Sequence, residues 1–120
     1  MTAADILDAV QSIPSTGMAT NFYLDESDSF GGFLTSAAER RDRLRSHLRH
    51  VGGGDLVLVG EAAGWKGARQ SGVPFTSAKT VGLPGVSTEA SATIVHGMLR
   101  TLSIAHRALL WNAFPLHPHQ

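Results

Sequence analysis

The stretch DLVLVGEAAGWKGARQSGVPFTS, residues 55–77, decides how the rest of the chain is interpreted. Its first six residues form a short β-branched and aliphatic run, which is typical of a strand buried on both faces. A glycine-rich segment follows at once, and glycine loses more backbone freedom on folding than any other residue. We therefore expect the segment to do more than connect two elements.

A second strand-like run, RALLWN, occupies residues 107–112, and a helical pattern lies between the two runs. Within residues 87–102 we expect Ser87 or Thr88 to cap a helix whose apolar stripe is formed by Ala92, Val95, Met98, Leu99 and Leu102. Strand, helix and strand in this order predict a βαβ unit with parallel strands and a right-handed connection. The stretch from residue 61 to residue 86 is longer than an ordinary connection of this kind, and such long loops are usually functional.

Two further helices are predicted upstream. The apolar spacing of residues 3–13 favours a helix that Pro14 ends, and Ser36 with Glu39 has the spacing of a capping box. The second helix should end at the glycines of residues 52–54. Its arginines, within residues 40–49, are expected to cover a solvated face, with phosphate contact as the alternative.

Residues 15–32 are expected to be irregular. The segment TNFYL, residues 20–24, is their only strand-like piece.

The chain has 120 residues, which predicts a single α/β domain spanning residues 1–120. Ten basic and ten acidic residues cancel, so net charge gives no support for nucleic-acid binding, although a local basic patch is still compatible with it. The sequence has no cysteine, which excludes disulfides, thiolate metal sites and cysteine-ligated iron–sulfur clusters in this chain and fits a cytoplasmic location. No apolar run approaches the roughly 18 residues that a membrane span needs, and the acidic N-terminus does not have the pattern of a secretory signal.

Three side chains stand out near the ends of the two predicted strands, because ligands of open α/β sheets bind outside the carboxyl ends of the strands. Glu61 could orient or deprotonate a water, or it is a solvated side chain or a turn cap. Phe75, fixed behind Pro74, could stack on a flat heterocycle, or it plugs the core. Asn112 offers both donors and an acceptor, or it is a turn residue.

The remaining signals are weaker. The glycines at positions 60, 64, 67 and 72 would let backbone amides approach an anionic or planar ligand, but their spacing matches neither a dinucleotide fingerprint nor a P-loop. His117 and His119 flank a proline with no further clustered ligand, so we expect no metal site and no cofactor.

Three segments together resemble the uracil-DNA glycosylase superfamily, in the family's order. They are LVLVGEAAGWKGARQSGVPFTS at 56–77, ASATIVHGML at 90–99 and ALLWNAFPLHPH at 108–119. The first is similar to the GEAPG motif with its SGVPFT-like continuation, and the third to the LLWNAFP motif of a bacterial branch. The resemblance implies a three-layer sandwich with a central parallel sheet. It also implies hydrolysis of the N-glycosidic bond of deoxyuridine in DNA, during base excision repair, after the base is flipped out of the stack.

The resemblance also implies roles for single residues. Glu61 would position the attacking water and favour the cationic sugar of the transition state, Phe75 would stack on uracil, and Asn112 would pair with one carbonyl and the ring N–H. The backbone near Gly60, Ala62 and Ala63 would contact the base. Lys66 and Arg69 would contact DNA. The implied partner is uracil-containing DNA, and the complete protein would be a monomer.

Two departures from the family pattern have consequences. Ala63 stands where the GEAPG motif has proline, which would change the geometry of the turn. The later HPSP-like histidine motif is missing, because HPH at 117–119 lies at a different place in the chain order. The resemblance therefore covers the front part of a C-terminally incomplete domain, which we expect to be marginally stable and a poor catalyst.

Two alternatives remain at this stage. One is a non-catalytic module that binds a base or nucleic acid. The other is an α/β domain that binds a nucleotide phosphate at a helix N-terminus, although the sequence lacks a lysine or Mg²⁺-binding serine at the required offset.

Overall fold

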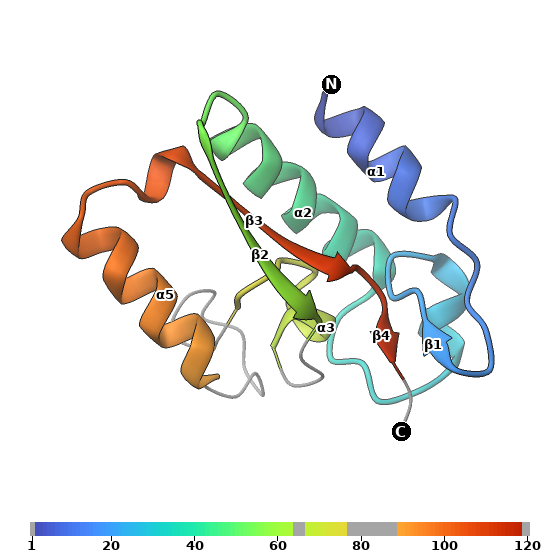
Figure 1. The fold of residues 1–120 in the computed structure, drawn as a ribbon. Helices are drawn as coiled ribbons and strands as arrows, with labels where there is room; N and C mark the ends of the chain where they lie inside the picture. Colours follow the sequence, from blue (N-terminus) through green and yellow to red (C-terminus); the bar gives the residue numbers. More distant parts are fainter. Residues whose placement is uncertain (1, 64–66, 77–88, 119–120) are drawn as a thin grey trace.

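The computed structural model describes residues 2–63, 67–76 and 89–118 (Figure 1). At its centre, strand β2 (Leu56–Ala62) pairs in parallel with β3 (Ala108–Phe114), so that Gly60 lies opposite Asn112. Helix α5 (Ala90–Thr101) lies between the two strands in sequence. The predicted parallel pairing is confirmed, and it brings the carboxyl ends of both strands to one edge of the sheet.

A second, smaller sheet joins segments from opposite ends of the sequence. Strand β1 (Ala19–Thr20) pairs antiparallel with β4 (His117–Pro118). The strand prediction for residues 20–24 was wrong beyond Thr20. Asn21 is fully buried, and its side-chain amide donates to the carbonyls of Val10 and Ile13 at 2.8 and 2.7 Å, which turns the chain out of the strand direction.

The helices begin and end for local reasons that the sequence largely reveals. Helix α2 (Ala37–Val51) is capped by Ser36, whose hydroxyl accepts from the backbone of Glu39 at 3.1 Å, and Gly52 is its C-cap, as predicted. Helix α1 (Ala3–Gln11) ends two residues before the predicted end, with Ser12 as its C-cap. The described residues also include three shorter elements: η1 (Asp25–Ser29), α3 (Ala68–Ser71) and η2 (Ala105–Arg107).

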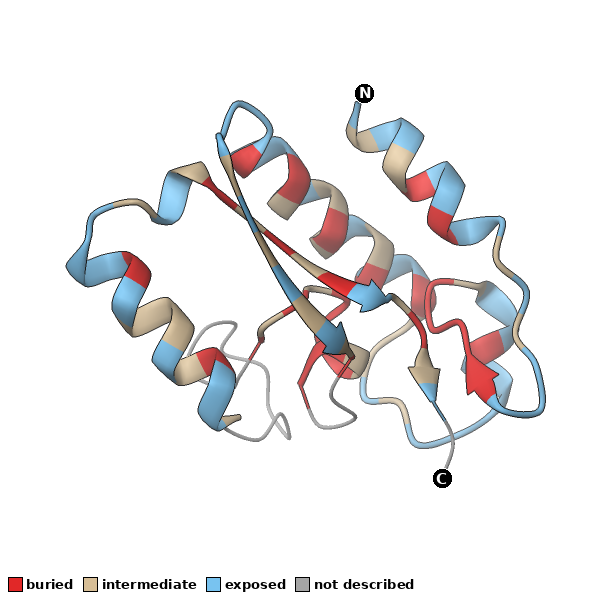
Figure 2. Cartoon of the chain, in the orientation of Figure 1, coloured by how far each residue is buried: buried red, intermediate tan, exposed pale blue. Residues whose placement is uncertain are grey.

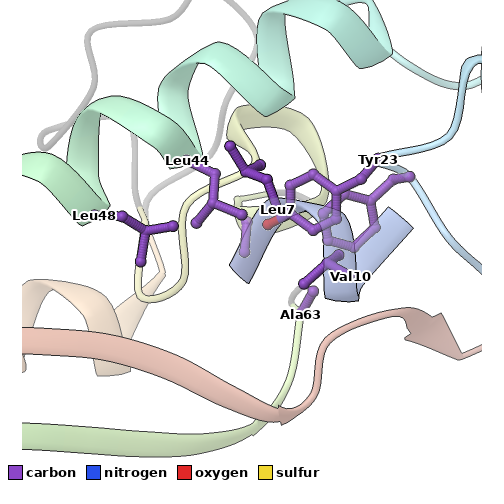
Figure 3. Close-up of a cluster of buried hydrophobic side chains, with 8 residues drawn as sticks. Leu7, Val10, Tyr23, Leu44, Leu48 and Ala63 are labelled. Carbon is purple, nitrogen blue, oxygen red and sulfur yellow. The ribbon is translucent and has the colours of Figure 1, made fainter. Parts of the chain in front are cut away.

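The core consists of two clusters on the two faces of β3. The first gathers side chains of α1, α2 and the segment after β1, including Leu7, Leu44 and Tyr23 (Figure 3). Leu109 and Trp111 of β3 pack against this cluster, whereas Ala108 and Leu110 belong to the second cluster with Leu99 of α5. The alternation along β3 is what a strand with both faces covered requires.

Strand β2 differs from the prediction, because it is not buried on both faces. Val57 and Val59 are 59% and 60% exposed, while the alternate residues Leu56 and Leu58 pack against the second cluster. Figure 2 shows β2 in the colours of intermediate and exposed residues. The aliphatic run therefore behaves as a strand covered on one face among the described residues. Such a run has the same composition as a fully buried strand, which is why the sequence pattern did not separate the two cases.

Arg40 also contradicts its prediction as a solvated side chain, because it is completely buried. It lies one turn before Leu44 on the face of α2 that packs into the core, and its guanidinium stacks over the Phe33 ring at 4.1 Å. Its donors are all engaged within the fold: Nε with the carbonyl of Phe22 at 2.6 Å, Nη2 with Ser27 Oγ at 3.0 Å and Asp28 Oδ1 at 3.1 Å, and Nη1 with the carbonyl of Thr35. Arg40 is thus a structural residue that ties α2 to the segment before it.

The chain is a compact mixture of helices and strands with one small parallel and one small antiparallel sheet. Its radius of gyration is 13.6 Å, close to the ~13.6 Å that the size scaling of single domains gives for this length. Among the described residues, none of the helices has the length and apolar character that crossing a bilayer requires.

Candidate ligand-binding site

A pocket of about 280 Å³ opens at the carboxyl ends of β2 and β3, where the sequence predicted a site. It is lined by Gly60, Glu61, Ala62, Ala68, Phe75, Glu89, Ser91 and Asn112. The structure thus brings together five of the predicted site residues, from two strands and the segment behind α3. Its walls combine carboxylate, amide, hydroxyl and aromatic groups, which suits a flat polar ligand.

Asn112 supplies the most informative group in the pocket. Its side chain is 6% exposed, lies on the face of β3 that also carries Leu110, and has no hydrogen-bond partner among the described residues. The amide lines the cavity and is not among the fully buried side-chain atoms that lack a partner, so it is open to a ligand. The amide can donate and accept at once, which suits a ligand edge with a carbonyl beside an N–H.

Gly60 brings the amide and the aromatic ring into one place. A Cβ at this position would lie 2.9 Å from Asn112 Oδ1 and 3.0 Å from Phe75 Cζ. The absence of a side chain is therefore a condition for the close approach of both groups, rather than for unusual backbone angles.

Phe75 is held in a backbone conformation that non-glycine residues rarely adopt, with φ at 53°. Its carbonyl is hydrogen-bonded to His96 Nε2 of α5 at 2.7 Å, which ties this residue to the helix on the same face of the sheet. Its ring packs against the second core cluster and also lines the pocket. Both sequence interpretations of Phe75 are thus compatible, because one side chain covers the core and forms a pocket wall.

Two carboxylates line the pocket, and only one of them was anticipated. Glu61 is exposed and has no described partner for its side chain. Glu89 is half-buried, and burial raises the pKa of its carboxyl group, while a hydrogen bond from the Gly67 N–H acts in the opposite direction. A Cβ on Gly67 would lie 2.7 Å from the Glu89 carboxylate, so this glycine permits the contact.

Glu89 was not predicted from the sequence, because glutamate is not a usual N-cap residue and the serine and threonine before it are. Glu89 is the N-cap residue of α5 and makes no side-chain cap bond, whereas the predicted caps Ser87 and Thr88 lie outside the described residues. Its position in the sequence could have indicated a place in the pocket, because Glu89 directly precedes a helix that lies between the glycine-rich segment and β3.

The other predicted site residues lie elsewhere. Ala63 is buried in the first core cluster, and its carbonyl meets His117 Nδ1 at 3.2 Å. Arg69 lies on α3 with its guanidinium 4.2 Å from the centre of the Phe33 ring, and its Nε is buried without a partner in the described part of the chain. Lys66 lies outside the described residues. A DNA-contacting role for Lys66 and Arg69 stays a prediction.

Residues 2–63, 67–76 and 89–118 contain no group of three or more side chains that could hold a metal ion. Of the two histidines considered as ligands, His117 is in strand β4 and His119 lies outside the described residues.

Comparisons with known proteins give no independent identification. A scan against protein-family models, a search of curated proteins and a search of solved structures each found no match for this chain. Fold and pocket together define an α/β protein with a ligand pocket at the carboxyl edge of its parallel strands. Its function has to be inferred from the chemistry of that pocket.

Proposed function

We propose that this protein is an N-glycosidase of the uracil-DNA glycosylase type, which removes uracil from DNA in base excision repair. The proposal includes the three-layer sandwich of that superfamily and a cytoplasmic location. The observation that supports it best is the meeting of Glu61, Phe75 and Asn112 in one pocket, since these are the three residues whose side chains the family resemblance implies in the reaction.

Recognition of the base would depend on Asn112 and Phe75. Uracil presents a carbonyl beside its N3–H, which the unpaired amide of Asn112 can bind with one acceptor and one donor. Cytosine presents an unprotonated N3 and an amino group at these positions, so its pattern is reversed. Stacking on the Phe75 ring would add on the order of 1–3 kcal/mol, and the base would reach the pocket by flipping out of the strand.

The chemical step would depend on Glu61. As the C1′–N1 bond lengthens, the sugar becomes positively charged and the bonding electron pair moves to the base. A carboxylate at the exposed end of β2 stabilises that sugar and takes the proton of the water that adds to C1′. Glu61 has no described partner that would compete for the water.

Turnover of uracil is expected to be slow, because the pocket opposes its departure. Uracil leaves as an anion, and no lysine, arginine or histidine is found among the described lining residues. Loss of one preorganised donor to such a charge typically reduces kcat by about 10²–10³. The same observation favours the second candidate function, a module that binds a flipped base without hydrolysing it.

The test is release of uracil from a single-stranded oligonucleotide that contains one deoxyuridine, for the wild type and for Glu61→Gln. We expect slow release by the wild type and at least about a hundredfold loss in the variant, while binding to the uracil-containing strand is kept. Glu26→Gln, a change of the same chemistry in η1 outside the pocket, is the matched control.

Three outcomes would contradict the glycosidase. Equal turnover by wild type and Glu61→Gln would remove the role of Glu61. Binding without release in the wild type would favour the non-catalytic module. Retention of a nucleoside triphosphate with indifference to uracil would favour phosphate binding, which the two pocket carboxylates disfavour on charge grounds.

A further inference from the structure

The pocket has an unusual charge for a site that is expected to release an anionic base. Glu61 enters from β2 and Glu89 from the start of α5, and the described lining residues include no cationic side chain. The remaining walls are the Phe75 ring, the amide of Asn112 and small residues. Two carboxylates beside an aromatic face form an environment that attracts positive charge.

Glu89 does not belong to the chemical step as described above. Its carboxylate is anchored by the Gly67 N–H, against a glycine whose missing Cβ leaves room for it, and it is half-buried at the pocket wall. Burial is the larger cause and raises the pKa of this carboxyl above its ordinary value, while the hydrogen bond from the Gly67 N–H opposes that rise. A fixed, partly desolvated negative charge facing a base pocket raises the affinity for a cationic ligand and lowers it for an anionic one.

We propose that this pocket also accepts positively charged nucleobases of the N7-alkylguanine class, with Glu89 as the residue that binds their charge. The inference rests on the proposed N-glycosidase function and extends it to a second class of substrate. N7-alkylguanine keeps the carbonyl beside an N–H that Asn112 can bind, on the edge that corresponds to that of uracil. Its cationic ring can face both Glu89 and the aromatic side chain of Phe75.

The reaction balances without a proton donor for the base. When the C1′–N9 bond of an N7-alkylguanine breaks, its electron pair neutralises the positive ring, so the base leaves as a neutral molecule. Water adds to C1′ of the cationic sugar and gives its proton to Glu61, which then releases it to solvent. The products are an abasic sugar, neutral alkylguanine and one proton. The pocket charge that hinders uracil therefore favours this substrate.

The two carboxylates are expected to act at different stages. In the bound substrate the positive charge is on the base, near Glu89, whereas in the transition state it moves toward the sugar, near Glu61. Glu89 should therefore contribute mainly to KM and Glu61 mainly to kcat. A purely structural role for Glu89 would affect uracil and alkylguanine to the same extent, so the comparison of substrates separates the two roles.

The experiment compares two single-stranded oligonucleotides of the same sequence, one with N7-methylguanine and one with uracil at the same position. Release is measured for the wild type, Glu89→Gln, Glu61→Gln and the control Glu26→Gln, and release from DNA alone is subtracted. We expect the wild type to release methylguanine faster than uracil. Glu89→Gln should raise KM for methylguanine at least about tenfold and lower the ratio of methylguanine release to uracil release, and Glu61→Gln should abolish both activities.

A second measurement needs no variant and so does not depend on the folding of one. Binding of the nucleoside N7-methylguanosine to the wild type should be at least about tenfold tighter than binding of guanosine. Equal affinities would overturn the inference, as would release of uracil without release of methylguanine, although the latter would leave the proposed uracil activity intact. Absence of release from both oligonucleotides would overturn the proposed function and this extension together.

Discussion

Position 60 shows how the absence of a side chain can shape a pocket. Gly60 lies in β2 opposite Asn112, and the Phe75 ring closes over it from the segment behind α3. A Cβ on Gly60 would contact Asn112 Oδ1 and Phe75 Cζ. Both atoms are at the ends of side chains, which can shift by a few tenths of an ångström. A methyl group at this position should therefore act on binding more than on folding.

We predict that Gly60→Ala weakens binding of a uracil-containing oligonucleotide by about tenfold, equivalent to ~1.4 kcal/mol. The Cβ would displace Asn112 Oδ1 and the Phe75 ring from the positions in which they face a base. The melting temperature should change by only a few degrees, because alanine also reduces the freedom of the unfolded chain. Gly53→Ala is the control, since nothing lies within 4 Å of its Cβ, and an equal loss of binding there would contradict the explanation.

A second prediction at the residue scale concerns Arg40. Arg40→Met keeps much of the aliphatic volume but leaves Ser27, Asp28 and two buried carbonyls without their donor. Each buried acceptor left without its donor costs about 1–3 kcal/mol, a large share of the stability of a small domain, whereas Asp28 is 41% exposed and can be hydrated. We therefore expect most of the variant to be unfolded at 37 °C, as measured by urea unfolding and circular dichroism.

Arg45 provides the contrast on the same helix. It pairs with Asp42 at 2.6 Å, but the side chains of both residues are exposed, and exposed pairs contribute little. Arg45→Gln should change the free energy of unfolding by less than about 0.5 kcal/mol. If Arg40→Met and Arg45→Gln lowered the free energy of unfolding by similar amounts, burial would not explain how much each arginine stabilises the fold.

Among the elements, α5 connects the fold to the site most directly. It begins at Glu89, covers the second core cluster through Leu99 and Val95, and holds the Phe75 carbonyl through His96. Its interior also contains Gly97, around which a Cβ would meet nothing within 4 Å. Gly97 therefore lowers the stability of the helix without making a contact that requires a glycine.

We predict that Gly97→Ala raises the free energy of unfolding by about 0.5–1 kcal/mol, because glycine is the poorer helix former and no contact is disturbed. Thermal unfolding should show an increase of a few degrees. Gly54→Ala should have the opposite sign, since its Cβ would lie 2.6 Å from the carbonyl carbon of Arg107. A lower melting temperature for Gly97→Ala would contradict the prediction.

The elements were more predictable from sequence than the contacts between them. Capping at Ser36, termination at Gly52 and the parallel pairing of β2 with β3 follow from local patterns, and all three occur. Exposure of Val57 depends on what packs against one face of a strand, which the run of aliphatic residues does not encode. Arg40 and Leu44 share one face of α2 through their spacing, but an arginine is almost never fully buried unless paired, so its burial depends on partners that the local sequence does not show.

The candidate site was predictable to a similar degree. Glu61, Phe75 and Asn112 were found because each follows a strand or a proline in a recognisable pattern. Glu89 joins the pocket through tertiary contact with Gly67, which lies 22 positions away in sequence and leaves no local signature. The left-handed conformation of Phe75 likewise depends on the surrounding fold.

At the scale of the whole molecule, His47 links helix α2 to the central sheet. It belongs to α2, and its Nε2 accepts a hydrogen bond from the backbone N–H of Leu110 in β3 at 3.4 Å. Burial, together with the nearby His50 of α2 and His96 of α5, lowers the pKa of His47 to about 4. Arg43 of α2 lines the same crevice and adds positive charge.

The pH dependence of stability follows from that lowered pKa. An unfolded histidine titrates near 6.5, so between pH 6.5 and 4 the unfolded chain binds a proton at His47 that the folded chain excludes. The contribution of His47 to the free energy of unfolding is therefore fully present above pH 6.5 and is lost as the pH falls toward 4. We predict that the free energy of unfolding falls by about 2 kcal/mol between pH 7 and pH 4.5, measured by urea unfolding.

His47→Gln should remove most of this pH dependence, because an amide can accept the hydrogen bond from the Leu110 N–H without taking up a proton. His106→Gln, a change on the surface of η2, should retain the slope, and an unchanged slope in His47→Gln would assign the acid sensitivity to other groups.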